Sequence, residues 1–501
     1  MSEPAYIPLY TAAQVRELDR IAIQERGIAG YELMCRAGRA LADCVARRWP
    51  QLRRVCIVCG AGNNGGDGYV LGRLLRDAGI EVTLLALAEP DTLRGDAARA
   101  AGDYRAAGGV VAAYAGELPG DAELLVDALL GTGLDRPVEG RYRAAIEALN
   151  RHPAPLLAVD VPSGLHADTG AILGVAAQAA CTLTFIGRKR GLYTGAGGQC
   201  AGSVEFADLA VPPDIYATQR AGVELVDWPP LEQLLAPRRR DAHKGAFGHV
   251  LVVGGNTGMS GAARLAAEAA ARCGAGLVSV ATRAVHAPVL NAGRPELMVH
   301  AVERAAELGP LLGRATVVVI GPGLGRDAWS QQLLGRVLES ERPLVVDADA
   351  LNLLAQDRLH RGNWILTPHP GEAARLLARS SAEIQRDRFT ALEGMVAEYG
   401  GSVVLKGAGS LIGDAAAGMR LCAHGNPGMA SGGMGDVLSG VLGALLAQGL
   451  PRFEAACAGV WLHAVAADRA ARRGERGLLA RDLLPWLRTL VNPDGTEQAP
   501  A

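Results

Sequence analysis

The chain has 501 residues, 49% of them hydrophobic and 20% charged, a composition that supports two or three domains with large cores and excludes a disordered chain. Its formal net charge of −2 gives no basic field, and its 4% aromatic content is too low for a base-stacking surface, so we do not expect nucleic acid as a partner. Nine cysteines, an odd number in a long chain, do not suggest a disulfide framework.

The N-terminal sequence lacks the basic and apolar stretches that mark a signal peptide. No run of about 20 residues is free of charges and turn residues, so we expect no membrane span and a cytoplasmic location. Cys56 and Cys59 form a C-x-x-C within the apolar run "RVCIVCG", where residues three apart on a strand face opposite sides. We therefore expect buried thiols there, with a redox pair as the alternative.

Alternating helix and strand patterns fill the first half of the chain. Such alternation predicts a largely parallel sheet with helices on both of its faces. In chain order the pattern predicts helices over 11–27 and 31–49, a strand over 53–60, a helix over 69–79, a strand over 81–87, a helix over 93–108, a strand over 123–131, a helix over 142–152, and strands over 154–164, 181–187 and 202–209.

The pattern lapses over residues 212–245, where prolines and the run "RRR" predict a linker rather than a nucleic-acid contact. The α/β pattern then restarts, and its first glycine loop differs from that of the first half, so we see no internal repeat. The segments that carry it are 248–255, 260–276, 277–282, 315–325, 343–355, 364–378 and 401–413, and helices close it over 436–448, 453–473 and 480–490.

A glycine loop, "GAGNNGGDG", follows the first predicted strand. Three of its glycines fit the G-x-G-x-x-G pattern of dinucleotide-binding loops, although a tight βα turn would also explain them. Asn63, Asn64 and Asp67 make the loop unusually polar, and a carboxylate would repel a phosphate. Amide and carboxylate oxygens instead suit a hard cation or a polar ring.

Two later predicted strands also end in oxygen-bearing side chains. One ends at Asp127, and another ends at Asp160 with Ser163 just beyond it. Ligands gather at the carboxyl ends of parallel strands, so we expect Asn64, Asp127 and Ser163 to meet around one cation. Asp67 and Asp160 would then face a substrate. Each aspartate alone could instead be an ordinary cap or turn residue.

The motifs "GNNGGDGYV", "DALLGTGL" and "DVPSGL" together resemble the YjeF-type N-terminal domain of the NAD(P)H-hydrate epimerases, over roughly residues 8–215. The resemblance implies a Rossmann-like domain that binds hydrated NAD(P)H, with a potassium ion on Asn64, Asp127 and Ser163. The substrate contacts that it implies are Asn63, Asn64, Gly65, Gly66, Asp67, Gly131, Thr132, Gly133, Leu134, Asp135, Arg136, Pro137 and Asp160.

Epimerisation at C6 of the hydrated ring requires a proton to move while a bond at C6 opens and recloses. A carboxylate in a dry pocket can accept that proton, and its conjugate acid can return it. We expect Asp160 to be this base, and the sequence does not exclude Asp67. The first half could also be a non-catalytic module that senses a ligand or binds a protein.

The run "GGMGD" ends at Asp436, where an apolar helix pattern begins. Glycine amides at a helix start favour phosphate, and a carboxylate there can take a proton from a hydroxyl group held against it. A plain helix N-cap is the alternative, but the run has more glycines than a cap requires. The pattern resembles the ribokinase-like fold, in which this aspartate deprotonates the phosphorylated hydroxyl.

Two more motifs belong to the same resemblance. "ILTPHPGE" is similar to the T-P-N-x-x-E of that fold, with His369 in place of the asparagine and Glu372 retained, which disfavours a plain sugar kinase. His369 could orient groups or shuttle a proton, or be an ordinary loop residue. "VVLKGAGSLI" brings Lys406 and glycines that suit nucleotide phosphates, unless it is a β-turn with an incidental lysine.

Six motifs in order, "GGNTGMSGAARLAAEAA", "GPGLG", "DADALNLL", "TPHPGE", "KGAGS" and "NPGMASGGMGD", resemble the ADP-dependent NAD(P)H-hydrate dehydratases over roughly residues 230–495. The resemblance implies that ADP phosphorylates the C6 hydroxyl with Asp436 as base and a magnesium ion present, and that elimination restores the dihydropyridine. The implied substrate contacts are Ala262, Gly323 (or Gly325), His369 and Asp436, and the implied nucleotide contacts are Lys406, Gly407, Ala408, Gly409, Ser410 and Gly435.

The sequence therefore predicts an α/β protein with a Rossmann-like three-layer αβα domain over residues 1–222 and a ribokinase-like αβα domain over residues 223–501. We expect a bifunctional enzyme that epimerises NADHX and NADPHX and dehydrates the S epimer with ADP. We also expect a homo-oligomer with no membrane partner, although the sequence does not specify the oligomeric state. The alternative is a ribokinase-like vitamin or sugar kinase with an accessory nucleotide-binding domain.

Overall fold

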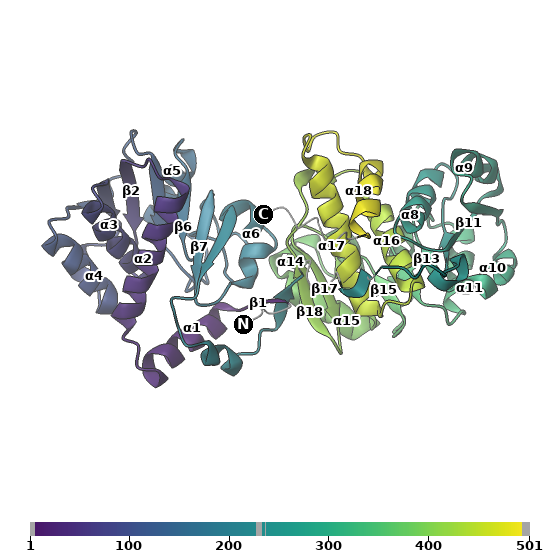
Figure 1. Cartoon of the computed structure of the whole chain (residues 1–501), viewed down its shortest axis with the longest axis horizontal. Coiled ribbons are helices and arrows are strands. Elements are labelled where there is room, and N and C mark those ends of the chain that lie inside the picture. Colours follow the sequence, from purple (N-terminus) through teal and green to yellow (C-terminus); the bar gives the residue numbers. More distant parts are fainter. Residues whose placement is uncertain (1–5, 227–232, 236, 493–501) are drawn as a thin grey trace. The chain divides into compact units, whose positions relative to one another are not determined.

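The computed structural model of the chain describes residues 6–226, 233–235 and 237–492. The chain divides into two compact units. We call Pro8–Val223 the N-terminal unit, and Met1–Ile7 together with Glu224–Ala501 the C-terminal unit. Figure 1 shows the first in purple to blue and the second mainly in green to yellow.

The first part of the chain alternates strands and helices, as its sequence pattern predicts. In order these are β1 (Ile7–Leu9), α1 (Ala12–Arg20), the π-helical turn η1 (Ile21–Glu25), α2 (Gly30–Arg48), β2 (Arg54–Cys59), α3 (Asn63–Asp77), β3 (Glu81–Ala86), η2 (Pro90–Thr92), α4 (Gly95–Ala106), β4 (Val111–Ala113), β5 (Leu124–Ala128), α5 (Gly140–Arg151), β6 (Leu156–Val159), β7 (Cys181–Phe185), η3 (Arg190–Tyr193), α6 (Gly197–Ala201), β8 (Ser203–Ala207), η4 (Pro213–Thr218) and β9 (Val223–Leu225).

The N-terminal unit is built on a seven-stranded sheet in the order β4-β3-β2-β5-β6-β7-β8. Every pairing in it is parallel. Successive side chains of a strand face opposite sides, so Val55 and Ile57 pack in one core beneath α2, α3 and α4, whereas Cys56 and Val58 pack in a second core with α5. The strand order reverses between β2 and β5, which is where ligands bind in such sheets.

The rest of the chain has more elements than the first. In order these are η5 (Gln233–Leu235), η6 (Lys244–Phe247), β10 (His249–Val253), α8 (Ser260–Arg272), β11 (Leu277–Thr282), η7 (Ala284–His286), α9 (Ala287–Gly293), β12 (Met298–Ala301), η8 (Ala305–Leu308), α10 (Gly309–Arg314), β13 (Val317–Ile320), α11 (Ala328–Leu338), β14 (Leu344–Val346), α12 (Ala348–Leu354), β15 (Trp364–Leu366), α13 (Pro370–Leu376), α14 (Ser381–Arg386), α15 (Arg388–Tyr399), β16 (Ser402–Leu405), β17 (Ser410–Asp414), β18 (Gly418–Cys422), η9 (Pro427–Met429), α16 (Met434–Ala447), α17 (Arg452–Ala471), η10 (Ala480–Asp482) and α18 (Leu483–Leu490).

An eleven-stranded sheet runs through the C-terminal unit in the order β1-β9-β18-β17-β16-β15-β14-β13-β10-β11-β12. The strands from β12 to β16 pair in parallel, and β16, β17 and β18 form an antiparallel meander. Helices α8, α16, α17 and α18 pack on one face. A side chain at Gly413 would meet α15, whereas the neighbouring Ile412 faces α17, so α15 covers the other face.

Both sheets confirm the predicted α/β class with helices on two faces. One expectation was wrong in detail, because the predicted linker over 212–245 contains η4, the strand β9 and the short turns η5 and η6. Three residues are too few for a recognisable alternation, and β9 is fixed by its neighbours β1 and β18. Within the described residues, no helix is both long enough and apolar enough to cross a bilayer.

Candidate active sites

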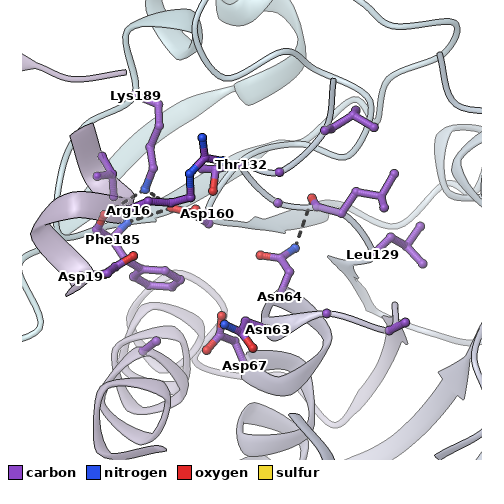
Figure 2. A pocket seen from close by; sticks show the side chains of 18 of the residues that line it. Arg16, Asp19, Asn63, Asn64, Asp67, Leu129, Thr132, Asp160, Phe185 and Lys189 are labelled. Atoms are coloured by element: carbon purple, nitrogen blue, oxygen red, sulfur yellow. Dashed lines mark hydrogen bonds and ion pairs between the residues drawn. The ribbon is translucent and has the colours of Figure 1, made fainter. Parts of the chain in front are cut away.

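A cavity of about 980 Å³ opens in the N-terminal unit beside the reversal point of its sheet. Figure 2 shows its polar lining, with Asn63, Asn64 and Asp67 projecting from the start of α3. The predicted residues that line it are Asn63, Asn64, Asp67, Gly131, Thr132, Gly133, Leu134, Asp135, Arg136, Pro137 and Asp160. The sheet therefore brings together in one cavity the loops that follow β2, β5 and β6. The sequence related these loops only by their shared position at strand ends and their oxygen-bearing side chains.

Gly65 and Gly66 do not line the cavity, and their role is close packing. A Cβ atom on Gly65 would lie 2.2 Å from the carbonyl oxygen of Gly60, and one on Gly66 would lie 2.5 Å from Cε of Met34. The contact with the Gly60 backbone cannot be relieved by a side-chain movement, so Gly65 allows α3 to start directly over the end of β2, whereas the flexible Met34 side chain can move away from position 66. This packing sets the position of Asn64 in the first turn of α3 and of Asp67 in the next.

Asp160 lies at the end of β6 in a left-handed backbone conformation, with φ of 65°. One of its carboxylate oxygens accepts hydrogen bonds from Lys189 Nζ at 2.5 Å, Thr184 Oγ1 at 3.0 Å and the Phe185 amide at 3.1 Å. Lys189 is only 1% exposed and also donates to the Phe185 carbonyl at 2.9 Å. An ammonium group buried in this way is compensated by the Asp160 carboxylate, which is shown reaching it in Figure 2.

Two other carboxyl groups in the cavity are hard to ionise. Burial raises the pKa of Asp19 to about 6, with Lys189 opposing the rise and Asp160 adding to it. Burial, together with the negative charges of Asp160 and Asp19, raises the pKa of Asp67 well above its usual range. The cavity therefore holds carboxyl groups in different protonation states at neutral pH.

The three predicted cation ligands lie in one hydrogen-bond network around the backbone of Leu130. Ser163 donates from its amide and its hydroxyl to Asp127, at 2.8 and 2.6 Å, and Asn64 donates to the Leu130 carbonyl at 3.3 Å. The Leu130 amide in turn donates to Ser163 Oγ at 2.8 Å. Asp127 is fully buried and burial raises its pKa, because its partners are neutral donors that only partly offset the lost hydration. A buried carboxylate with amide, hydroxyl and carbonyl oxygens beside it is a donor set that fits potassium.

Asp19 and Lys189 line this cavity and were missed by sequence reasoning. Asp19 is on α1, ahead of the first glycine loop, and Lys189 follows β7 in a basic segment with isolated glycines instead of a glycine-rich loop. A lysine four residues beyond a buried strand, in "FIGRKRG", is the only local signal for the second of them.

Asp436 occupies the first turn of α16 in the C-terminal unit, after Gly433 with φ of 92°. Burial raises the pKa of Asp436 to about 7, with Asp347 and Asp349 adding to the rise and Lys406 opposing it. A carboxylate with a pKa near neutrality is suited to accept a proton from a substrate hydroxyl. The N-cap residue of α16 is Gly433, and Asp436 is the third residue of the helix, so Asp436 is not its N-cap.

Lys406 lies beside Asp436 at the end of β16 and is paired with other acids. Its Nζ donates to Asp347 at 2.7 Å and lies 3.8 Å from Glu372, and Ser439 on α16 donates to the second oxygen of Asp347 at 2.7 Å. A Cβ atom on Gly435 would lie 3.2 Å from Lys406 Nζ, so this glycine lets α16 approach the pair. Asp347 and Ser439 were missed by sequence reasoning.

His369 is the N-cap of α13. Its Nδ1 accepts from the Gly371 amide at 3.0 Å, while Glu372 accepts from the His369 amide at 2.8 Å. Burial and the charges of Lys406 and Arg375 lower the pKa of His369, which keeps the ring neutral at pH 7. Burial raises the pKa of Glu372 to about 7.

Ala262 and Gly323 meet at the reversal point of the second sheet, between β10 and β13. A Cβ atom on Gly323 would lie 3.0 Å from that of Ala262, and the Asn256 amide donates to the Gly323 carbonyl at 2.7 Å. The neighbouring Gly325 amide donates to Asp349 at 2.9 Å. Asp349 also raises the pKa of Asp436. Asp349 therefore contacts the loop that contains Gly323 and Gly325 and also acts, through its charge, on Asp436.

Gly407, Ala408, Gly409 and Ser410 connect β16 to the antiparallel β17. Arg388, which is 1% exposed, supports this turn from below by donating to the carbonyls of Leu405, Lys406 and Gly409 at 3.1–3.4 Å. The Arg388 guanidinium therefore anchors the turn through its carbonyl oxygens.

Comparison with known proteins covers the whole chain. A family described as YjeF-related protein N-terminus matches residues 30–191, and one described as NAD(P)H-hydrate dehydratase matches residues 250–488. The bifunctional NAD(P)H-hydrate repair enzyme of Coxiella burnetii is 50% identical, with 97% of this chain and 99% of that protein covered, and the one of Escherichia coli is 45% identical, with 99% and 96% covered. A crystal structure of a ribokinase-like superfamily protein from Enterococcus faecalis is 31% identical, with 55% of this chain and 96% of that chain covered and a TM-score of 0.50.

Proposed function

The chain belongs to the bifunctional NAD(P)H-hydrate repair enzymes, and from this premise we propose how its residues divide the two reactions. It is an NAD(P)H-hydrate epimerase and an NAD(P)H-hydrate dehydratase in one chain. The N-terminal unit, Pro8–Val223, epimerises R- and S-NAD(P)HX, and the C-terminal unit dehydrates the S epimer; the units divide one residue from the expected boundary at 222/223, and residues 1–7 fall with the C-terminal unit instead of the first domain. The carrying observation is that each unit gathers glycine loops and carboxylates beyond the carboxyl ends of its parallel strands.

In the epimerase, the hydrated nicotinamide ring occupies the cavity beside Asp160, which acts as the base. Lys189 pairs with this carboxylate, and the hydrogen bonds to one of its oxygens fix its orientation. Asp67 faces the hydrated ring from α3, and Asn63 and the loop from Gly131 to Pro137 contact the rest of the nucleotide. The polarity of this lining supports a substrate that carries hydroxyl, amide and phosphate groups.

A potassium ion is held by Asn64, Asp127 and Ser163. The support is the buried Asp127 carboxyl, whose hydrogen bonds come from the neutral donors Ser163 and Leu129. When bound, the ion supplies a positive charge that stabilises the ionised form of this carboxyl and the loop above it. The rest of the reaction uses the protein's own groups.

In the dehydratase, Asp436 takes the proton of the C6 hydroxyl as its oxygen attacks the β-phosphate of ADP. The products of this step are the C6 phosphate ester and AMP. Loss of phosphate with a proton from C5 then forms the C5–C6 double bond of NAD(P)H. The raised pKa of Asp436 supports this role, because a base whose pKa lies near the working pH accepts a proton and gives it up readily.

ADP phosphates are bound by the turn from Lys406 to Ser410 and by the amides at Gly435. Magnesium enters with the nucleotide, and the carboxylates of Asp347 and Glu372 around Lys406 are oxygen donors that fit a hard divalent ion. The ion supplies charge neutralisation for the phosphoryl group. Ala262, Gly323 and His369 contact the hydrated ring.

Recovery of NADH absorbance tests both assignments in one chain. S-NADHX with ADP requires only the dehydratase, whereas R-NADHX with ADP requires the epimerase first. We expect Asp436→Ala to abolish recovery from both epimers and Asp160→Ala to abolish it from the R epimer alone. Asp357→Asn, at an exposed position, is the matched control and should keep both activities. Unchanged recovery from R-NADHX by Asp160→Ala would contradict the epimerase assignment. Sedimentation velocity of the same preparations tests the expected homo-oligomer.

A further inference from the structure

The cavity of the N-terminal unit holds three partly buried carboxyl groups, from Asp19, Asp67 and Asp160, and one fully buried ammonium group, from Lys189. Asp160 forms an ion pair with Lys189, whereas Asp19 and Asp67 form no ion pair within the described part of the chain. The other charged side chains that line the cavity are Arg16, Asp96, Asp135, Arg136 and Glu139; Figure 2 shows Arg16 beside Asp160, and Asp96 is partly buried.

Asp67 is exposed by 9%, and its free surface opens into the cavity. Among the residues that the structure describes, no group donates a hydrogen bond to its carboxyl. Its buried neighbour Cys59 is a neutral thiol, because burial raises the pKa of that group well above its usual range. Burial and the negative charges of Asp160 and Asp19 also raise the pKa of Asp67 well above its usual range, which favours the protonated form of this carboxyl group.

We propose that Asp67 is the general acid of the epimerisation and Asp160 its general base, with Lys189 as a positioning residue that orients the Asp160 carboxyl group through their ion pair. This inference rests on the proposed epimerase function. Figure 2 shows the two carboxyl groups on different elements of the same cavity, Asp67 on α3 and Asp160 at the end of β6. Two carboxyl groups whose surroundings separate their protonation states are the usual arrangement for paired acid and base catalysis.

The reaction balances without a cofactor. Asp67 gives its proton to the C6 hydroxyl oxygen, the C–O bond breaks with its electron pair leaving on water, and the ring nitrogen lone pair forms a C6–N1 double bond. A water molecule then adds to the other face of C6, giving one proton to the Asp160 carboxylate while the double-bond pair returns to nitrogen. The two carboxyl groups then return to their starting forms by exchanging protons with water. The reverse direction uses the same groups with their roles exchanged.

Exchange of oxygen with the solvent tests this route without any substitution. Epimerisation of R-NADHX by the full chain in ¹⁸O-labelled water, without ADP, should give S-NADHX that carries one labelled oxygen at C6. A reaction without enzyme gives the background. An epimerised product that retains its original oxygen would overturn the proposal, because the bond to oxygen would not have been broken.

The pH dependence of epimerisation tests the role of Asp67. In the wild type the rate should fall at high pH, where Asp67 loses its proton. We expect Asp67→Asn to lower the rate by roughly 10²–10⁴-fold and to remove this high-pH decrease. Asp160→Asn should lower the rate but keep the high-pH decrease, because the base is lost and Asp67 is retained. Asp77→Asn, at the exposed far end of α3, is the matched control and should behave as wild type.

The role of Lys189 is tested by a conservative replacement. Lys189→Met should lower the epimerisation rate, because Asp160 loses the cation that orients it, and Lys189→Arg should restore most of the rate. A rate that Lys189→Arg does not restore would refute this positioning role. Wild-type chain that does not interconvert the epimers would refute the proposed function. Interconversion that survives Asp67→Asn with an unchanged profile would refute the inference alone, and Asp67→Glu controls for a folding defect.

Discussion

Replacing Asp436 by asparagine should make the C-terminal unit more stable while it stops dehydration. The side chain keeps its shape but loses a carboxyl group whose pKa burial raises from 3.8 to about 7. The folded protein holds this proton up to pH 7, whereas the unfolded chain loses it near pH 4, so ionisation destabilises the folded wild type as the pH rises. This loss of stability begins near the pKa of the carboxyl group in the unfolded chain and reaches its full size above the pKa in the folded protein.

The size of the effect follows from the size of that rise. At about 1.4 kcal/mol for each unit of pKa, the ionised carboxyl costs the folded state up to roughly 4 kcal/mol above pH 7. Between pH 5 and pH 7 the advantage of Asp436→Asn should grow by roughly 2 kcal/mol, and it should then level off. For a unit of this size, that corresponds to several degrees in the midpoint of thermal unfolding.

Thermal unfolding of the full chain from pH 5 to pH 8.5 measures this difference, and recovery of NADH absorbance from S-NADHX and ADP measures activity. We expect a loss of roughly 10²–10⁴-fold in dehydration with the higher midpoint. Asp357→Asn should change neither quantity. A stability difference that does not depend on pH would refute the argument from burial, and retained dehydration would refute the role of Asp436 as base.

Three further outcomes follow from the two sites. Ser163→Ala should remove any difference in epimerisation rate between potassium chloride and choline chloride, and a persisting difference would place the ion elsewhere. Lys406→Met should lower the free energy of unfolding by roughly 3–5 kcal/mol in urea titrations, because the buried Asp347 loses its cation partner. An unchanged free energy of unfolding would show that the Lys406–Asp347 ion pair does not stabilise the folded protein. Gly65→Ala should cost roughly 1–3 kcal/mol and slow epimerisation, because its Cβ would lie 2.2 Å from the Gly60 carbonyl; wild-type midpoint and rate would show that the backbone relaxes freely.

The α/β class and the main strands could be predicted from the sequence because their signals are local. Apolar runs such as 55–59 are long enough to be read as buried strands, and the glycine loops follow them directly. The three-residue strands β1, β4 and β9 could not be predicted, because their pairing depends on neighbours distant in the chain. The order of the strands, and with it the reversal points, is also a property of the folded sheet alone.

The candidate sites divide in the same way. Asp127, Asp160 and Asp436 lie at strand ends or helix starts, so motif spacing was enough to single them out. Asp19 belongs to an amphipathic helix with basic and acidic neighbours, where an aspartate normally faces solvent. Only the packing of α1 beside the cavity brings Asp19 to Lys189, and no spacing along the chain encodes that contact.

The path of the chain limits how the protein can be cut. Because the residues up to Ile7 belong with the unit that resumes at Glu224, the epimerase half is an insertion between two neighbouring strands, β1 and β9. A gene truncated to begin at residue 223 would lack β1, so the sheet of the dehydratase half would end in the three-residue strand β9. The unpaired backbone groups of this new edge strand would be prone to aggregation. Excising residues 10–222 and joining the two flanks with a short glycine-rich linker would keep β1 paired with β9. This is the better way to obtain the dehydratase half alone.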